Sequence, residues 1–184
     1  MDIHMAANAA PRMFVGMKLS TLEEVARALD QAGVRFILVG GIAVVAHGYG
    51  RLTRDLGLVI ELEADVLRRA FTALESLGYR PRVPVTAAGL ADPRQRRAWI
   101  EEKGMTVLNF HSDLRRHTPI DVFVTEPFDF DEEYGAADVF DISPGCSVRV
   151  VRLATLLRMK DEAGRPQDLA DVAELRHLHR SDES

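Results

Sequence analysis

A pair of glycines and a downstream aspartate are the residues of this sequence whose types and spacing suit phosphate chemistry. Gly40 and Gly41 follow an apolar run, and Asp55 lies on the next predicted strand. A glycine pair between a buried strand and a helix lets backbone N–H groups approach phosphate oxygens. A second acid two residues after Asp55 would share its strand face and help to bind Mg²⁺, the hard cation that phosphoryl transfer needs. Position 57, however, is a glycine.

Neither feature decides the chemistry alone. Glycine pairs also occur at strand ends for steric reasons, so Gly40 and Gly41 are equally compatible with a purely structural turn. Glu61 shares the strand face with Asp55, but four residues at about 3.3 Å each place it roughly 13 Å from position 57. That distance is too long for both positions to bind one ion, so we expect that Glu61 does not replace the missing acid.

The stretch resembles the nucleotidyltransferase superfamily, whose members carry a hydrophobic residue and Gly-Gly or Gly-Ser, then Asp, a hydrophobic residue and Asp or Glu. The lead-in Arg51-x-Thr53-x-Asp55 and the segments 156–160 and 164–171 are similar to bacterial proteins related to the AbiEii abortive-infection toxins. The similarity covers about residues 20–178. It implies an α/β (α+β) nucleotidyltransferase-type fold, in which helices flank a mixed β-sheet and further helices follow at the C-terminus.

The resemblance also implies an activity. Its elements are Mg²⁺ as cofactor, a nucleoside triphosphate (NTP) as substrate, and transfer of the nucleotide monophosphate to a hydroxyl of RNA, a protein or a small molecule. In that superfamily a third acid on a later strand completes the metal site and can activate the hydroxyl, and Asp121 lies in the matching context. Asp55 and Asp121 are therefore the predicted metal ligands. The alternative for Asp121 is an edge-strand carboxylate that faces water.

Two C-terminal residues, Lys160 and Asp168, are implied in nucleotide contact and catalysis by the same resemblance. A lysine on a helix can neutralise triphosphate charge, and a nearby acid can orient it. The alternatives are a solvated helix face for Lys160 and an acid favoured by the helix dipole for Asp168. The predicted catalytic residues are Asp55, Asp121, Lys160 and Asp168, and the predicted nucleotide-binding residues are Gly40, Gly41, Arg51, Thr53, Arg54 and Lys160.

Three of the remaining side chains have open interpretations. Arg51 and Arg54 flank the predicted metal strand, where they would contact phosphate or form surface ion pairs. His47 is interpreted as a helix-end or core histidine rather than a catalyst.

Gly57 is the departure from the family pattern, and it has a functional consequence. With one acid missing, Mg²⁺ depends more on water and on nucleotide phosphates, so we expect weak metal binding and a large loss of rate. One hypothesis is an impaired nucleotidyltransferase. The other is an inactive module that binds a nucleotide or a partner protein, such as a cognate antitoxin. Replacing Gly57 with Asp is expected to restore binding if the chain is an impaired enzyme.

Two charge clusters bear on the acceptor. A basic cluster would suit RNA phosphates, unless its members are ordinary helix-surface arginines: Arg80, Arg82, Arg94, Arg96, Arg97, Arg115 and Arg116. An acidic cluster would suit a cationic substrate such as an aminoglycoside, unless it is a solvated loop: Glu126, Asp129, Asp131, Glu132, Glu133 and Asp138.

Composition favours one soluble globular domain. The chain has 184 residues, of which 47% are hydrophobic and 28% charged, with a net charge of −5 that argues mildly against general nucleic-acid binding. Residues 1–17 are interpreted as a poorly ordered segment or tag remnant, and 18–184 as a single domain that includes a helical part over 153–180. No apolar run approaches the roughly 20 residues that cross a bilayer, and no export signal precedes the domain, so we predict a cytoplasmic protein without a membrane segment. Cys146 is the single cysteine, which excludes an internal disulfide.

The hydrophobic pattern predicts the elements that position these residues. A capping box at Ser20 starts a helix that Gly33 stops. The pattern predicts strands over 35–39, 55–61, 105–111, 120–125 and 147–152, and helices over 42–47, 63–77, 94–103, 153–163 and 166–179. The segment 128–141 is predicted to be part helix and part strand.

Overall fold

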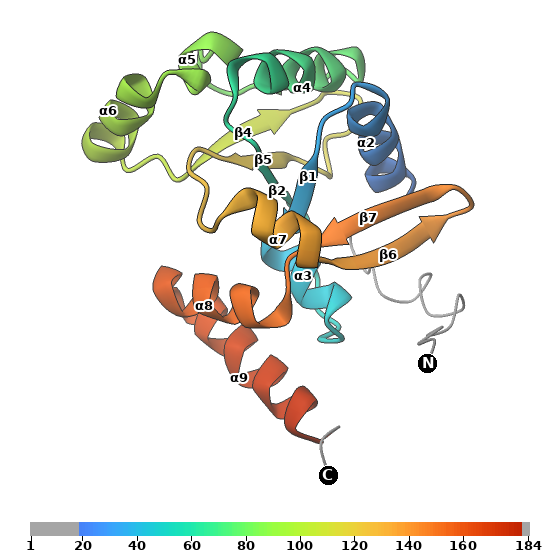
Figure 1. Ribbon diagram of the computed structural model, residues 1–184. Coiled ribbons are helices and arrows are strands. Elements are labelled where there is room, and N and C mark those ends of the chain that lie inside the picture. Colours follow the sequence, from blue (N-terminus) through green and yellow to red (C-terminus); the bar gives the residue numbers. More distant parts are fainter. Residues whose placement is uncertain (1–18, 182–184) are drawn as a thin grey trace.

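The structure, a computed structural model, describes residues 19–181, which contain one seven-stranded mixed sheet (Figure 1). The strands are β1 (Phe36–Val39), β2 (Leu56–Ile60), β3 (Arg80–Pro81), β4 (Val107–His111), β5 (Ile120–Phe123), β6 (Asp138–Ser143) and β7 (Cys146–Val150). Their order across the sheet is β3-β4-β5-β2-β1-β7-β6. β1 runs parallel to β7 and β2 parallel to β5, while the other neighbouring pairs are antiparallel.

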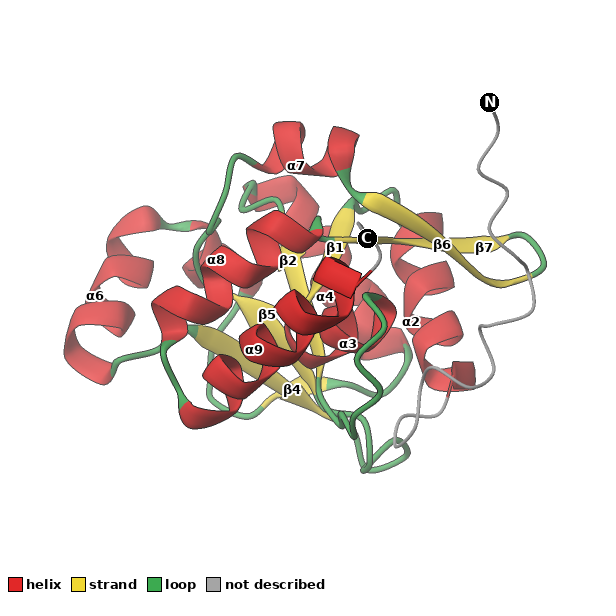
Figure 2. Ribbon diagram, turned by 90° about the horizontal axis from the view of Figure 1, so that it is seen from below, coloured by secondary structure: helices red, strands yellow, loops and turns green. Residues whose placement is uncertain are grey.

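Helices cover the sheet on both sides (Figure 2). On one side, α2 (Leu19–Gln31) packs against α4 (Ala64–Ser76). On the other side lie α3 (Gly40–Ala46), α8 (Leu153–Ala163) and α9 (Pro166–Ser181). Three further helices precede β4 and β6, namely α5 (Ala87–Ala91), α6 (Pro93–Lys103) and α7 (Phe130–Ala136). No helix within residues 19–181 is long and apolar enough to cross a membrane.

The two halves of the sheet are covered differently. Every residue of β1 and β2 is buried, so these central strands are covered on both faces. Along β4 and β5, buried and partly exposed residues alternate, which is the pattern of strands covered on one face only. Phe110 of β4 is buried against Phe71 of α4, with ring centroids 5.1 Å apart. The face of β4 and β5 that points away from α4 is therefore the more open one.

Most predicted elements are confirmed, with shifts at their ends. The helix over 153–163 is found with the predicted bounds, and Asp92 accepts a hydrogen bond from the Arg94 backbone N–H at the start of α6, which ends at Gly104 in a left-handed conformation. Leu19 already lies in α2, so Ser20 is inside the helix rather than at its cap. The whole of the predicted N-terminal segment, residues 1–17, lies outside the described part, as do residues 18 and 182–184.

Two short elements were not predicted. β3 has two residues, one of them a proline, and α5 has five. Neither is long enough to show a period in the sequence. β3 nevertheless adds an edge strand next to β4.

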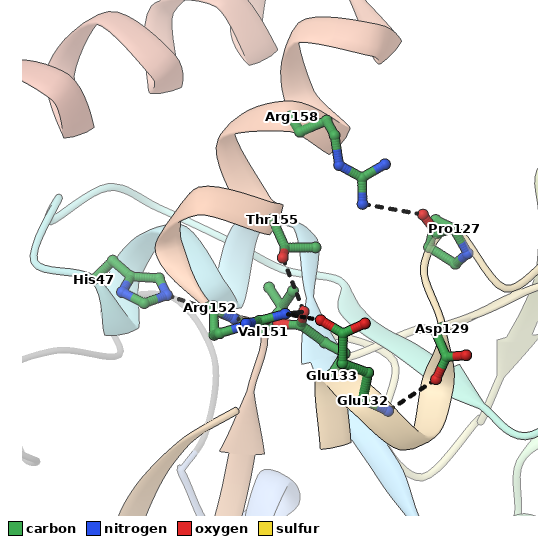
Figure 3. A network of polar contacts seen from close by, with 9 residues as sticks. All are labelled: His47, Pro127, Asp129, Glu132, Glu133, Val151, Arg152, Thr155 and Arg158. Carbon is green, nitrogen blue, oxygen red and sulfur yellow. Dashed lines mark hydrogen bonds and ion pairs between the residues drawn. The ribbon is translucent and has the colours of Figure 1, made fainter. Parts of the chain in front are cut away.

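A buried glutamate fixes α8 to α7 (Figure 3). Glu133 is only 1% exposed, and its carboxylate accepts hydrogen bonds from the Arg152 backbone N–H (2.8 Å), the Arg152 guanidinium (2.7 Å) and the Thr155 hydroxyl (2.9 Å). Burial by itself would raise the pKa of Glu133, but these donors hold it below its usual range. Close by, the His47 ring nitrogen Nε2 lies 2.8 Å from the Val151 carbonyl, which places His47 at a helix end, as predicted. The start of α8 is thus held by contacts from α7, through Glu133, and from the end of α3, through His47.

We expect Glu133→Ala to lower the free energy of unfolding by about 1–3 kcal/mol, because it leaves the donors around the carboxylate without a partner. Urea denaturation would measure the loss. Glu132→Ala is the matched control, since Glu132 is 73% exposed and lies 3.5 Å from Arg152; it should cost less than about 0.5 kcal/mol. Equal losses from the two substitutions would contradict a specific stabilising role of the Glu133 hydrogen bonds.

Candidate functional site

A row of four residues crosses the central strands on one face of the sheet. Gly57 of β2 pairs with Val39 of β1 on one side and with Asp121 of β5 on the other, and Asp121 pairs with Asn109 of β4. Residues paired across neighbouring strands point to the same face. Asp121 therefore stands beside the position where a side chain of residue 57 would be.

Asp55 lies close to this row. It precedes Gly57 by two residues and is exposed. Burial raises the pKa of Asp121, and the negative charge of Asp55 raises it further, whereas a hydrogen bond from the Asn109 amide to Oδ1 (2.7 Å) acts in the opposite direction. The two carboxylates that the sequence predicted as partners are thus near enough to interact.

The glycine pair forms the first turn of α3, directly after β1. Gly40 has φ +70°, a left-handed conformation that favours glycine, and a Cβ there would meet open space. A Cβ on Gly41 would lie 2.4 Å from the Thr53 hydroxyl oxygen. Gly41 is therefore required by close packing of the segment around Thr53, whose own side chain is buried.

Asp171 of α9 is the centre of a network of charged side chains. Asp171 is fully buried, and its carboxylate lies 2.7 Å from Lys160 Nζ and accepts a 2.9 Å hydrogen bond from Arg51 Nη2. Arg51 Nε is 2.7 Å from the same carboxylate, an ion-pair contact without hydrogen-bond geometry. Burial alone would raise the pKa of Asp171, but the donors, with Lys160 and Gln167 the largest, bring it below its usual range. Lys160 Nζ also donates to Asp168 at 2.8 Å.

Three of the predicted site residues belong to this network, and a fourth, Arg54, lies outside it. Arg51, Lys160 and Asp168 are engaged with one another or with Asp171. The alternative predicted for Arg51 was a surface ion pair, whereas its partner Asp171 is fully buried. Arg54 is exposed next to Asp55, and its guanidinium has no hydrogen bond or ion pair within residues 19–181. Asp171, which lies three residues after Asp168, was missed, because only a folded chain shows which acid of a helix is buried.

Solved structures with the same architecture identify the fold. No protein-family model and no curated protein matches the chain. An antigenic nucleotidyltransferase-like protein from Paracoccidioides brasiliensis is similar over 87% of this chain and 76% of its own, with a TM-score of 0.52 and 19% identity. A proposed nucleotidyltransferase from Thermotoga maritima is similar over 89% and 92%, with a TM-score of 0.52 and 12% identity. The chain has a nucleotidyltransferase fold.

In this nucleotidyltransferase fold few acidic residues gather at the predicted metal site. No group of three or more His, Cys, Asp or Glu residues is arranged to hold a metal ion in the described part of the chain. Glu61 forms an ion pair with Arg35 (2.9 Å), so it is engaged elsewhere, in line with the expectation that it does not replace the missing acid. Two carboxylates, Asp55 and Asp121, remain. Mg²⁺ is commonly held by one or two carboxylates together with water and substrate phosphates, so this pair fits the ion only as part of a nucleotide complex.

Gly57 is a glycine for a steric reason. A Cβ at this position would lie 2.9 Å from the backbone oxygen of Val39 and 3.3 Å from its Cγ2. Backbone of a central strand cannot give way as a side chain end can. An aspartate at position 57 is therefore not a simple restoration of the metal site, because β1 and β2 would first have to separate.

The two charge clusters have different outcomes. Within the acidic cluster, Glu133 is buried with Arg152, Asp131 pairs with Arg35 (2.8 Å), and the Asp129 side chain caps α7. Glu126 accepts a hydrogen bond from a backbone N–H of residue 62. These carboxylates mostly hold the fold together. In the basic cluster, Arg96 and Arg115 are bonded to backbone carbonyls, whereas Arg80 and Arg82 are exposed.

We expect Gly57→Ala to destabilise the protein by about 1–3 kcal/mol, since the added methyl group overpacks the β1–β2 contact. Gly57→Asp should be at least as damaging, because it adds a carboxylate to a buried position beside Asp121. Chemical denaturation measures both. Gly50→Ala is the control, because a Cβ there meets nothing within 4 Å. A fully stable Gly57→Asp protein would show that β1 and β2 can accommodate an acid.

The raised pKa of Asp121 has a consequence for stability. A carboxyl group whose native pKa is raised binds its proton more tightly when folded, so the contribution of Asp121 to stability is fully present below its unfolded pKa and is lost as pH rises through its native pKa. Asp121→Asn removes this charge. We expect its melting temperature at neutral pH to rise by about 2 °C or more, with no gain at pH 4. Asp113→Asn, at an exposed turn residue, should change neither value. A lower melting temperature of Asp121→Asn at neutral pH would contradict this account.

Proposed function

We propose that this chain binds a Mg²⁺–NTP complex beside Gly40, Asp55 and Asp121, and that it transfers the nucleotide monophosphate to a hydroxyl acceptor at a reduced rate. The observation that carries the proposal is the row of Gly57, Asp121 and Asn109 next to the glycine turn, with Asp55 close enough to act on Asp121. The fold is that of nucleotidyltransferase-like proteins.

Asp55 and Asp121 would hold the ion together with phosphate oxygens and water. The ion supplies neutralisation of the charge that develops on the departing pyrophosphate. Asp121 has the second task of taking the proton of the acceptor hydroxyl. Its Oδ1 is occupied by the Asn109 amide, which orients the carboxylate and leaves Oδ2 for the proton. Its raised pKa makes it a better base than an ordinary aspartate.

The Asp171 network contacts the glycine turn of this site through Arg51. Arg51 Nη2 lies 3.1 Å from where a Cβ of Gly41 would be, so the ion pair of Arg51 with Asp171 holds the glycine turn and the C-terminal helices together. We propose that Lys160 and Asp168 act through this network, by keeping Asp171 charged and Arg51 in place. Among the predicted nucleotide-binding cations, Arg54 is the one left exposed for a phosphate.

The second candidate function is nucleotide binding without transfer. It is favoured by the steric contact at Gly57, which excludes the second carboxylate for a packing reason. In that case the protein would act through a partner, and a cognate antitoxin is the partner that the AbiEii-like motifs suggest. An aminoglycoside acceptor has less support, because the carboxylates of the acidic cluster are engaged in structural contacts.

Thermal shift with each of the four NTPs, with and without Mg²⁺, tests binding. An NTP at about 100 times its Kd should stabilise the protein by roughly 2.7 kcal/mol. Asp55→Asn and Asp121→Asn should each remove the Mg²⁺-dependent part, while Asp113→Asn should keep it. Pyrophosphate release, measured with RNA, the protein itself and small hydroxyl compounds as acceptors, then tests transfer. Binding without any release would select the second candidate, and the absence of both would overturn the two functions together.

A further inference from the structure

The open half of the site face extends from Asp121 to the edge of the sheet. Asn109 pairs with Asp121, and the ladder continues to β3 through a hydrogen bond from the Arg82 backbone N–H to the Asn109 carbonyl (2.9 Å). Two residues further along β4, His111 pairs with Arg80 of β3. Side chains alternate along each strand, so Asn109, His111, Arg80 and Arg82 all lie on the face that carries Asp121.

This surface is lined by polar atoms that lack internal partners. Arg80 and Arg82 are both exposed. Their guanidinium groups make no hydrogen bond or ion pair within residues 19–181. Two further atoms, Asn109 Oδ1 and His111 Nδ1, are shielded from water and have no hydrogen-bond partner among the described residues. Buried polar atoms without a partner are uncommon in folded proteins, and they mark places where a bound group can complete the bonding.

Two arginines from different parts of the chain direct their charge at Asp121. Arg82, which directly follows β3, and Arg165, which lies in the connection between α8 and α9, both act to lower the pKa of Asp121. Positive groups therefore reach the carboxylate from the sheet edge and from the C-terminal helices. Neither guanidinium is neutralised by an ion pair in the described structure, so both remain available to an anionic ligand.

We infer that the face of β3 and β4 beside Asp121 is the acceptor subsite, and that the acceptor carries a phosphate group that binds Arg80 and Arg82. The inference rests on the proposed function, because it places the acceptor hydroxyl at Asp121. Two strand spacings, about 10 Å, separate the backbone of Asp121 from that of Arg82. The Asp121 and Arg82 side chains extend from these backbones, so a hydroxyl and a phosphate on one small molecule or one nucleotide unit need to bridge only part of this distance. Guanidinium groups suit phosphate oxygens, which they bind with two parallel hydrogen bonds.

Binding of two phosphate-bearing probes tests the subsite. The first is a fluorescein-labelled tetraribonucleotide with a free 3′ hydroxyl, followed by fluorescence anisotropy at low salt. The second is unlabelled ribose 5-phosphate as a competitor. We expect the tetraribonucleotide to bind and the double variant Arg80→Ser, Arg82→Ser to weaken binding at least about tenfold. Displacement by ribose 5-phosphate would indicate a small phosphorylated acceptor, and failure to displace would indicate a polynucleotide end.

The matched control is the double variant Arg94→Ser, Arg97→Ser on α6. It removes the same charge from exposed arginines that have no effect on the pKa of Asp121. Binding should change less than about twofold in this control. Equal losses in the two double variants, or no binding of either probe to the parent protein, would overturn the subsite. Mg²⁺–NTP stabilisation of the parent, measured in parallel, separates this failure from a failure of the proposed function.

Discussion

The contact between the Val39 backbone and Gly57 sets the terms for the whole site. At this pair β1 approaches β2 so closely that even one added carbon would lie 2.9 Å from the Val39 oxygen. The same strand then delivers Gly40 and Gly41 to the start of α3. Tight packing that brings the glycine turn next to Asp121 is thus also what excludes a second carboxylate. Under the proposed function, the same contact limits the metal ligands to Asp55 and Asp121.

Some charged residues near the site form buried ion pairs, and others are exposed to solvent. Lys160, Asp168 and Arg51 satisfy the buried Asp171, whose isolated charge would be costly to bury. This arrangement ties α8 and α9 to the segment that packs on Gly41. Three residues that the sequence motifs assign to nucleotide contact are therefore engaged in holding these elements together. Arg54 is left as a cation on the exposed side.

The sequence predicted the parts of the site that depend on local periodicity. Apolar neighbours were enough to put Asp121 on a strand, whereas Asp55, predicted as the first residue of a strand, lies just before β2. Side-chain partners were beyond its reach, because Arg51 and Asp171 are far apart in the chain and meet only after α9 has packed. The reason for Gly57 was equally hidden, since it depends on the spacing of two strands. Short β3 escaped prediction, and with it the position of Arg82 on the site face.

The charge balance of the site follows from these constraints. A complete nucleotidyltransferase-type acid cluster concentrates negative charge and depends on a cation to accept a triphosphate. Here two carboxylates are accompanied by exposed or unpaired Arg54, Arg82 and Arg165, of which the latter two act directly on Asp121. Guanidinium groups can neutralise phosphate charge that a metal ion would otherwise have to balance. Under the proposed function, a site with two carboxylates and these arginines would bind a metal ion weakly while still attracting phosphate, and it would hold a nucleotide better than it would turn one over.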